Sequence, residues 1–274
     1  MSLDTASFNF VRDMVRRDAA IVLDDDKTYL VESRLRPLAR QAGSEDVGDY
    51  VRSLRTRMTQ QTRNEVVEAM TTNETSFFRD QEPFRALREK VFPDLIAARR
   101  NTLSVWSAAC SSGQEAYSIA MSALECRTMN TYGVRIVGTD ISAAMVAKAT
   151  SGLYTQLEVS RGLPAQMLVK YFRRDGMGWR VNPEIRALST FSTGNLLGNP
   201  PAPGVFDIIF LRNVLIYFDG PTKRQIVRRA RQALRPDGAL FLGTAEIPVD
   251  AAENWERISV GRTSYYRPRK ELRR

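Results

Sequence analysis

Residues 73–80, NETSFFRD, combine residue types that suit neither a hydrophobic core nor a solvated surface. Asn73, Thr75 and Arg79 carry hydrogen-bonding groups, and they surround an adjacent pair of phenylalanines. Polar groups of this kind could bind a ligand. The segment also falls at the boundary between an N-terminal part with purely helical periodicity and a later part with a different pattern. It is therefore a candidate binding segment.

A second candidate is the small-residue turn AACSSGQEAYS at residues 108–118, which joins a predicted strand to a predicted helix. Small residues let the backbone approach a ligand and leave helix-start N–H groups free for an anion. Its single glycine, Gly113, does not make a G-x-G-x-x-G fingerprint. Asp140 ends the next predicted strand, where a carboxylate either accepts hydrogen bonds from ribose hydroxyls or caps the following helix. Together, turn and acid indicate a nucleoside-type cofactor.

A third candidate follows the apolar strand FDIIF in the segment LRNVLIYFD, residues 211–219. Arg212 and Asn213 come just after the strand, and Tyr217 follows one helical turn later. A simpler interpretation makes Arg212 an ordinary strand-end cation and Tyr217 a core aromatic. The glycine patterns of nicotinamide and phosphoryl-transfer enzymes are both absent. The later stretch LRPDGALFLGT is typical of nucleoside-binding methyltransferases, in which a helix ends in a Pro/Gly turn before the next strand.

The composition excludes several classes of chemistry. The chain has 274 residues, no histidine and two cysteines, Cys110 and Cys126, which argues against zinc sites and histidine-dependent nucleophilic catalysis. We expect no metal. No run approaches 18 apolar residues and the N-terminus lacks the features of a signal peptide, so we expect a cytoplasmic protein without membrane insertion.

Two kinds of periodicity divide the chain. Residues 5–70 show helical patterns only, which predicts a small bundle in which Tyr29, Leu30, Leu35 and Leu38 share a buried side. From about residue 100, strands and helices alternate, which predicts a parallel sheet covered by helices on both faces. Residues 154–187 interrupt this alternation with a short helix and a hairpin around DGMGW, and we interpret them as an insertion.

The net charge of +9 is unevenly distributed. Residues 223–235 contain six cations and no acid. Most such charges simply lie on solvated helix faces. The alternative, more specific interpretation is that these cations bind an acidic partner.

Five segments in order, NETSFFRD, WSAACSSGQEAYSIAM, GTDIS, GNLL and LRNVLIYFD, closely resemble the signature segments of CheR-type chemotaxis receptor methyltransferases. The resemblance covers most of the chain. Ala116 departs from it, because the family usually has proline there. The family transfers a methyl group from S-adenosylmethionine to glutamate side chains of chemoreceptors.

The resemblance implies a fold. We expect an all-helical N-terminal domain at residues 1–72, and an α/β, Rossmann-like class I methyltransferase domain at residues 73–274. It also implies a small inserted β-subdomain at about residues 160–190.

The resemblance also assigns residues. It implies that Arg79 and Tyr217 flank the transferred methyl, with Asp140 on the ribose. Asn195 and Leu196 would lie beside the adenine. The implied cofactor-binding set is Asn73, Thr75, Arg79, Glu115, Asp140, Asn195, Leu196, Arg212 and Asn213. The implied receptor-docking set is Lys27, Arg34, Arg36 and Arg40.

The expected partner is the cytoplasmic helical region of chemoreceptors, to whose membrane arrays the protein would be recruited. The inserted hairpin is short, so we do not expect it to bind a C-terminal receptor peptide. We expect a monomer that does not bind nucleic acid. Two alternatives differ in class: a methyltransferase acting on RNA, favoured by the cationic stretch 223–235, and a non-catalytic cofactor-binding scaffold.

Overall fold

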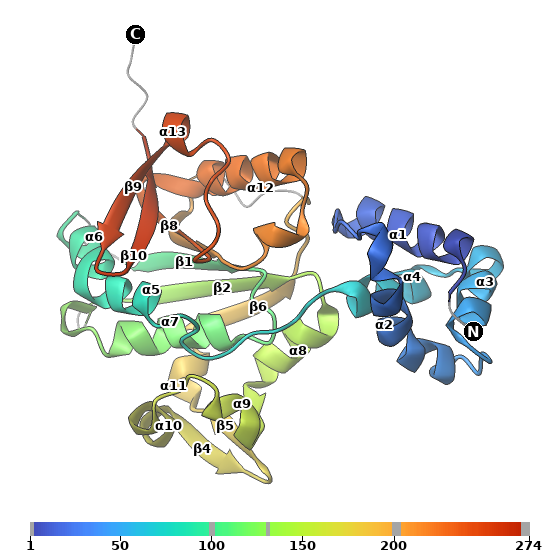
Figure 1. The fold of residues 1–274 in the computed structure, drawn as a ribbon. Helices are drawn as coiled ribbons and strands as arrows, with labels where there is room; N and C mark the ends of the chain where they lie inside the picture. The colour runs from blue at the N-terminus through green and yellow to red at the C-terminus, as the bar shows by residue number, and fades with distance from the viewer. Residues whose placement is uncertain (1–2, 99–101, 130–131, 199–203, 270–274) are drawn as a thin grey trace. The chain divides into compact units, whose positions relative to one another are not determined.

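The computed structural model describes residues 3–98, 102–129, 132–198 and 204–269. Its chain forms two compact units (Figure 1). The first contains residues 1–72 together with 217–222, and the second contains residues 73–216 and 223–274.

The first unit is a bundle of four helices: α1 (Thr5–Ala19), α2 (Thr28–Gln41), α3 (Val47–Arg57) and α4 (Gln60–Met70), with a 3-10 turn η1 (Asp25–Lys27) before α2. Polar side chains cap the starts of three of them, because the first N–H groups of a helix have no partner within it. Asp4 accepts from the Ser7 N–H, Asp46 from the Asp49 N–H, and Thr59 from the Thr62 N–H.

The predicted buried side of α2 is confirmed at Leu35, and Leu30 and Leu38 are partly buried against the same core. The prediction is wrong for Tyr29, which is 64% exposed, whereas Val31, Leu35 and Ala39, spaced four residues apart, are buried. Tyr29 is only the second residue of the helix, and it lies off the stripe that these three residues form. Gly43 follows the helix with φ +72°, and its N–H donates to the Arg40 carbonyl, as expected for a glycine that ends a helix.

The second unit is built on a seven-stranded sheet in the order β6-β2-β1-β7-β8-β10-β9. Its strands are β1 (Leu103–Ala108), β2 (Val134–Asp140), β6 (Ser189–Thr193), β7 (Phe206–Leu211), β8 (Leu234–Leu242), β9 (Trp255–Val260) and β10 (Thr263–Pro268). Strand β10 runs antiparallel to both of its neighbours, β8 and β9, and the other paired strands of this sheet run parallel. All six residues of β7 are buried, as expected for a central strand covered on both faces. The strand order reverses beside β1, which is where ligands bind in such sheets.

Helices cover the sheet: α5 (Glu82–Ala86), a π turn η2 (Leu87–Val91), α6 (Phe92–Ala98), α7 (Gln114–Leu124), α8 (Ala143–Ser151) and α12 (Gly220–Ala233), with 3-10 turns η3 (Arg127–Met129) and η4 (Leu215–Tyr217) and a short α13 (Ala251–Asn254). Figure 1 shows α7 and α12 on opposite sides of the strands. Helix α12 buries Ile226, Val227, Ala230 and Ala233, so the cations of residues 223–235 largely occupy its outer side.

An insertion between β2 and β6 carries a second, three-stranded sheet in the order β3-β5-β4. Its elements are β3 (Leu153–Tyr154), α9 (Gln156–Ser160), α10 (Ala165–Tyr171), β4 (Phe172–Asp175), β5 (Gly178–Val181) and α11 (Pro183–Arg186). The predicted fold class, a helical N-terminal unit followed by a class I methyltransferase sheet, is confirmed. None of the helices in the described ranges is long and apolar enough to span a membrane.

Candidate active site

The segment Asn73–Asp80 is anchored by its two phenylalanines. Phe77 is fully buried, and its ring makes edge contacts with the rings of Tyr154 and Phe172 in the insertion at 5.0 and 5.5 Å. The Phe78 ring meets that of Phe84 at 5.2 Å, and the Phe78 N–H donates to Ser118 Oγ of α7 at 2.9 Å. The aromatic pair therefore anchors the segment in apolar surroundings.

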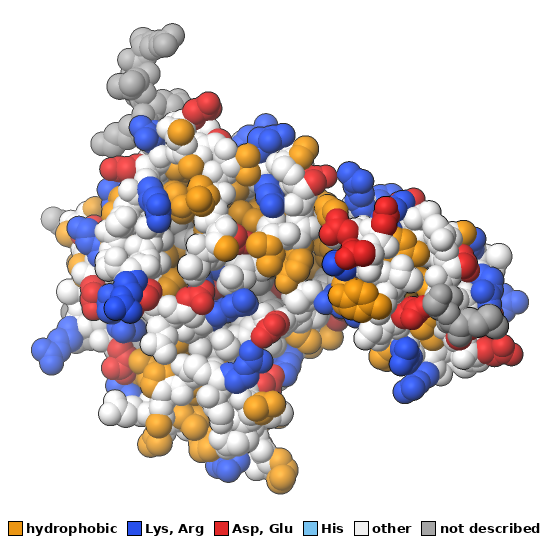
Figure 2. All heavy atoms as spheres, in the orientation of Figure 1, with side chains coloured by type: hydrophobic (Ala, Val, Ile, Leu, Met, Phe, Trp, Pro, Cys, Tyr) orange, Lys and Arg blue, Asp and Glu red, His pale blue; other side chains and the backbone are white. Residues whose placement is uncertain are grey.

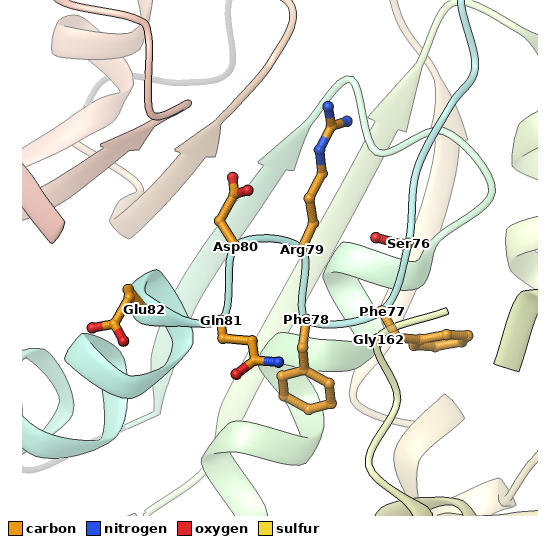
Figure 3. Close-up of a pocket in the computed structure, with 8 residues that line it drawn as sticks. All are labelled: Ser76, Phe77, Phe78, Arg79, Asp80, Gln81, Glu82 and Gly162. Carbon is orange, nitrogen blue, oxygen red and sulfur yellow. The ribbon is translucent and has the colours of Figure 1, made fainter. Parts of the chain in front are cut away.

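The polar residues of the segment point away from this anchor. Figure 3 shows the Arg79 and Asp80 side chains on one side of the backbone and the Phe78 and Gln81 side chains on the other. Residues 76–82 and Gly162 also line a shallow pocket. Arg79 Nη1 donates to the Glu74 carbonyl at 3.2 Å, its one hydrogen bond to a described residue, so most of its donors remain available.

Non-glycine residues with left-handed backbone cluster around the candidate site. They are Phe78 and Asp80 in this segment and Gln81 just after it, Ala109 and Ser111 in the turn after β1, and Asn213 after β7, with φ between 42° and 65°. Such conformations cost about 1–3 kcal/mol each and persist where the surrounding structure holds them, often at functional sites. Three separate segments therefore meet at the carboxyl edge of the sheet in constrained conformations.

Arg212 joins two of these segments. Its side chain is 1% exposed and lies between two carboxylates, with Nη2 2.7 Å from Asp80 Oδ2 and Nη1 3.1 Å from Glu115 Oε2. Nη2 also donates to the Arg79 carbonyl at 2.9 Å. A buried cation needs this degree of pairing, because removing an unpaired charge from water costs several kcal/mol. Arg212 is therefore a bridge that fixes Arg79 and Asp80 relative to the start of α7.

Glu115 completes this network from the first turn of α7. Its Oε1 accepts a hydrogen bond from Ser107 Oγ of β1 at 2.8 Å. Burial raises the pKa of Glu115, against the opposing effect of Arg212. Burial also raises the pKa of the Cys110 thiol strongly, and the nearby Asp140 and Glu115 add to the shift. The thiol is therefore protonated at neutral pH and a poor nucleophile.

Asp140, at the end of β2, holds the turn after β1. One of its oxygens accepts from the Ser111 N–H at 2.7 Å and the other from the Ser142 N–H at 2.9 Å. Ser111 Oγ in turn donates to the Asn73 carbonyl at 2.8 Å, so the turn also fixes the start of the NETSFFRD segment. Asp140 therefore fixes the small-residue turn at the carboxyl ends of β1 and β2, the edge at which such sheets bind ligands.

Asn213 is positioned by a residue that we did not single out, Glu246. The Glu246 carboxylate accepts from the N–H groups of Asn213, Leu215 and Gly243 at 2.8, 2.8 and 2.7 Å. It thereby ties the loop after β7 to the end of β8. Asp80, Ser107 and Ser111 were missed in the same way. Each lies in a quoted motif, but the contacts of Asp80 and Ser111 reach residues far apart in the sequence, and Ser107 contacts Glu115 across the turn that joins β1 to α7.

The remaining predicted cofactor residues lie at nearby strand ends or on the segment itself. Asn195 and Leu196 follow β6, and Asn195 Oδ1 accepts from the Leu197 N–H at 2.9 Å. Arg229 of α12 donates to the Leu196 carbonyl at 3.2 Å. Thr75 is partly buried within the NETSFFRD segment.

Tyr217 and the predicted docking residues belong to the helical unit. Tyr217 ends η4, and its carbonyl accepts from the Val22 N–H at 3.0 Å. Lys27 pairs with Asp26 at 2.9 Å, and Arg36 and Arg40 are exposed on α2. Arg34 is engaged within its own unit, since it donates to the Met70 and Thr71 carbonyls and to Thr72 Oγ1 at 2.5, 2.9 and 2.7 Å. Its guanidinium therefore satisfies the carbonyls at the end of α4.

The residues at this edge fit S-adenosylmethionine. Asp140 lies at the end of β2, where a carboxylate can accept hydrogen bonds from ribose hydroxyls. Arg212 Nε is buried without a hydrogen-bond partner in the described chain, which suits the carboxylate of the methionine end, and the unused donors of Arg79 suit a second carboxylate. No group of three or more His, Cys, Asp or Glu side chains within the described ranges is arranged to hold a metal ion.

Comparisons with known proteins agree with this geometry. Residues 6–71 match the family domain described as CheR methyltransferase, all-alpha domain, and residues 73–264 match CheR methyltransferase, SAM binding domain. Chemotaxis protein methyltransferase 1 of Pseudomonas aeruginosa is 41% identical over 97% of this chain and 99% of its own. Chemotaxis protein methyltransferase Cher2 of Pseudomonas putida is 42% identical over 90% and 92%. The Escherichia coli chemotaxis protein methyltransferase is 36% identical over 90% and 86%. The chain therefore belongs to the CheR family of S-adenosylmethionine-dependent methyltransferases.

Proposed function

We propose that this protein transfers the methyl group of S-adenosylmethionine to glutamate side-chain carboxylates of chemoreceptors, giving methyl esters for chemotactic adaptation. The observation that carries the proposal is Arg79. Its guanidinium lies on the polar side of the NETSFFRD segment, next to the Arg212 network, with most donors unused. A guanidinium fork matches a carboxylate better than any other side chain does.

The chemistry asks little of the protein beyond placement. S-adenosylmethionine supplies a methyl group that its sulfonium has already activated. A glutamate carboxylate is ionised and nucleophilic at pH 7, so no general base is needed and the absence of histidine is no obstacle. What the chain supplies is alignment, which can be worth about 7–11 kcal/mol in favourable intramolecular reactions.

Arg79 would orient the attacking carboxylate, with Tyr217 as a second donor. The strength of this contact matters, because an ion pair that is too tight stabilises the ground state and slows attack.

Arg212 would have a different role, because it would not contact the attacking carboxylate. Asp80 and Glu115 already pair with Arg212, so it would act by holding the backbone carbonyl of Arg79 in place.

The proposed partner is the acidic helical region of a chemoreceptor in a cytoplasmic membrane array, docked by exposed cations of α2. Arg36 and Arg40 are better suited to docking than Arg34, whose donors bind the end of α4. Arg36 and Arg40 would raise the association rate more than the affinity. We propose that the protein acts as a monomer, and that its short hairpin, Phe172–Val181, does not bind a receptor C-terminal peptide.

An experiment with two acceptors tests the proposal. The protein is incubated with methyl-labelled S-adenosylmethionine together with receptor cytoplasmic fragments and total RNA. Alkali-labile label on receptor glutamates is expected. Label on RNA alone would replace the proposal with the RNA methyltransferase alternative. Cofactor binding by calorimetry without label on either acceptor would favour a non-catalytic scaffold.

A further inference from the structure

A hollow of about 420 Å³ lies at the carboxyl edge of the sheet, beyond the residues assigned to the cofactor. Three segments enclose it: the turn Asp80–Pro83, the loop Gly243–Ile247 after β8, and the tip of the β9–β10 hairpin. Asp80 belongs both to this hollow and to the Arg212 network. The hollow therefore adjoins the position at which we place the attacking carboxylate.

The hairpin tip that closes the hollow has a defined conformation. Val260 pairs with Thr263, which leaves a two-residue loop of Gly261 and Arg262. Gly261 has φ +56°, which suits the first central position of a type II′ turn. A side chain at Gly261 would collide with the guanidinium of Arg85 in α5, which pairs with Glu82 at 2.8 Å. The tip is therefore packed against α5, and Arg262 projects from a fixed turn.

The acidic side chains that line the hollow have partners within the protein, whereas its arginines form no ion pair within the part of the chain that the structure describes. Its three carboxylates already have partners: Asp80 pairs with Arg212, Glu82 pairs with Arg85, and Glu246 accepts three backbone N–H groups. Its two arginines, Arg257 and Arg262, form no ion pair with any described residue.

Arg257 also has a preset orientation, because its Nε–H donates to Ser264 Oγ across the hairpin at 3.0 Å. This bond leaves both terminal nitrogens of the fork available. On the opposite rim, the Ile247 side chain is 64% exposed, which adds an apolar contact surface beside the two cations.

We propose that this hollow is a substrate subsite in which Arg257 and Arg262 bind a second acidic side chain of the methyl-accepting segment. This inference rests on the proposed function, and it adds a rule for which glutamates are chosen. A glutamate with another acid within about one or two helical turns, or about 5–11 Å, is preferred over one with neutral neighbours. Ile247 then contacts the apolar side of the same segment. The two cations make a charge contact of the kind that gives specificity and speeds encounter.

The test uses a chemoreceptor cytoplasmic fragment that the wild-type protein methylates, with its methylated glutamates mapped by mass spectrometry. A second fragment replaces the acids within two helical turns of one mapped glutamate by glutamine. KM and kcat for that glutamate are measured with the wild type, Arg257→Gln, Arg262→Gln and the double variant. Arg135→Gln is the matched control, since Arg135 is exposed at the start of β2, on the amino edge of the same sheet.

For the acidic fragment, the double variant is expected to raise KM about tenfold, and each single variant about threefold, with kcat retained within about twofold. Removing the neighbouring acids should raise the wild-type KM by a similar factor and leave the double variant little further affected. Equal KM values for wild type and double variant on the acidic fragment would overturn the subsite. It would also be overturned if the double variant raised KM by the same factor on both fragments. If no receptor fragment accepts label from the wild type, the proposed function itself fails, and the two failures are thereby separated. The Kd for S-adenosylhomocysteine, unchanged in all variants, verifies that each is folded.

Discussion

At the scale of single residues, two neighbouring arginines have opposite characters. The fork of Arg212 is buried and binds two carboxylates and a carbonyl, while the Arg79 guanidinium donates a single hydrogen bond to a described residue, the Glu74 carbonyl. A paired, buried cation fixes structure, because removing either partner leaves an uncompensated charge. A largely unpaired guanidinium beside such a network is instead available to an incoming ligand. The two residues should therefore differ in how their loss divides between cofactor binding and turnover.

Arg79→Ala is expected to lower kcat for receptor methylation by about 100-fold or more, the usual cost of losing one preorganised donor at a reacting centre. The Kd for S-adenosylhomocysteine should change by less than about threefold, because the Arg212 network remains intact. Stopped assays and titration calorimetry measure the two quantities. Arg161→Ala is the control, since Arg161 pairs with Glu74 of the same segment at 2.8 Å and is exposed. Equal loss of binding and turnover in Arg79→Ala would move Arg79 to a cofactor role.

Site residues could be predicted where they belong to a recognisable motif. They were missed where their role depends on a contact that only the folded chain makes. Asp140, Arg212 and the NETSFFRD segment stand at strand ends or at a boundary, so their positions could be predicted. The roles of Asp80 and Glu246 could not. Each binds a partner more than 30 residues away, and a pairing of this kind leaves no periodicity in either segment.

At the scale of elements, the insertion supports the active-site segment directly. Gly162 follows α9 with φ +84° and packs against the Phe77 carbonyl. The Phe77 ring is held by Tyr154 and Phe172 from the small sheet. The insertion therefore supports the NETSFFRD segment by packing against Phe77.

A pair of glycine variants tests this support. Gly162→Ala should lower the free energy of unfolding by more than about 3 kcal/mol and weaken turnover, because a Cβ would displace the Phe77 backbone. Gly176→Ala has the same left-handed strain at φ +56° but meets no atom within 4 Å, so it should cost only about 1 kcal/mol and leave turnover unchanged. Denaturant unfolding and kinetics measure both. Similar losses in the two variants would show that backbone strain alone, and not the contact with Phe77, explains the effect.

Elements with strong patterns could be predicted, and weakly patterned ones could not. The strand β7, FDIIFL, is apolar except for Asp207, and the predicted alternation placed it correctly. The strand β9, WERISV, was missed, because it lies at the sheet edge and only its Trp255 is fully buried. Its shape comes from its partner β10, with which all six of its residues pair.

Within the helical unit, an ion pair joins α1 to α4. Arg63 Nη2 donates to Asp18 Oδ1 at 2.6 Å, and this hydrogen bond lowers the pKa of Asp18 below its ordinary value of 3.8. Asp18 therefore stabilises the fold above pH 3.8, and this stabilisation is lost as the pH falls through the lowered pKa. Asp18→Asn should cost about 1 kcal/mol at pH 7 and progressively less below that window.

Hydrogen exchange of the α1 and α4 amides, measured against pH, checks the Asp18 prediction. Asp13→Asn serves as its control, because Asp13 is 68% exposed beside Arg12 and should contribute little. A loss that is independent of pH would exclude the ion pair as its cause.

At the scale of the whole molecule, the helical unit is assembled from distant parts of the chain. Residues 217–222 group with residues 1–72, although they follow β7 of the sheet domain. No periodicity in their sequence indicates this, because the contacts are a backbone hydrogen bond from Val22 to Tyr217 and an ion pair between Arg16 and Asp219, which are 203 residues apart in the sequence. The net charge of +9, by contrast, is visible in the sequence, and Figure 2 shows Lys and Arg side chains spread over the surface among acidic ones. Which cations meet a partner therefore depends on which are already engaged.

Three arginines of α2 separate these roles. Arg36→Gln with Arg40→Gln removes two exposed cations, and it should lower kcat/KM for receptor fragments about tenfold at low salt and progressively less as salt screens the attraction. Arg34→Gln removes the donors that bind the end of α4, so it should lower the unfolding temperature instead. Steady-state kinetics from about 20 to 500 mM salt and thermal unfolding measure the two effects, with the Kd for S-adenosylhomocysteine unchanged in every variant. If the double variant kept the wild-type salt dependence, α2 would not be the docking surface, because a charge-driven encounter cannot survive the loss of its charges unaltered.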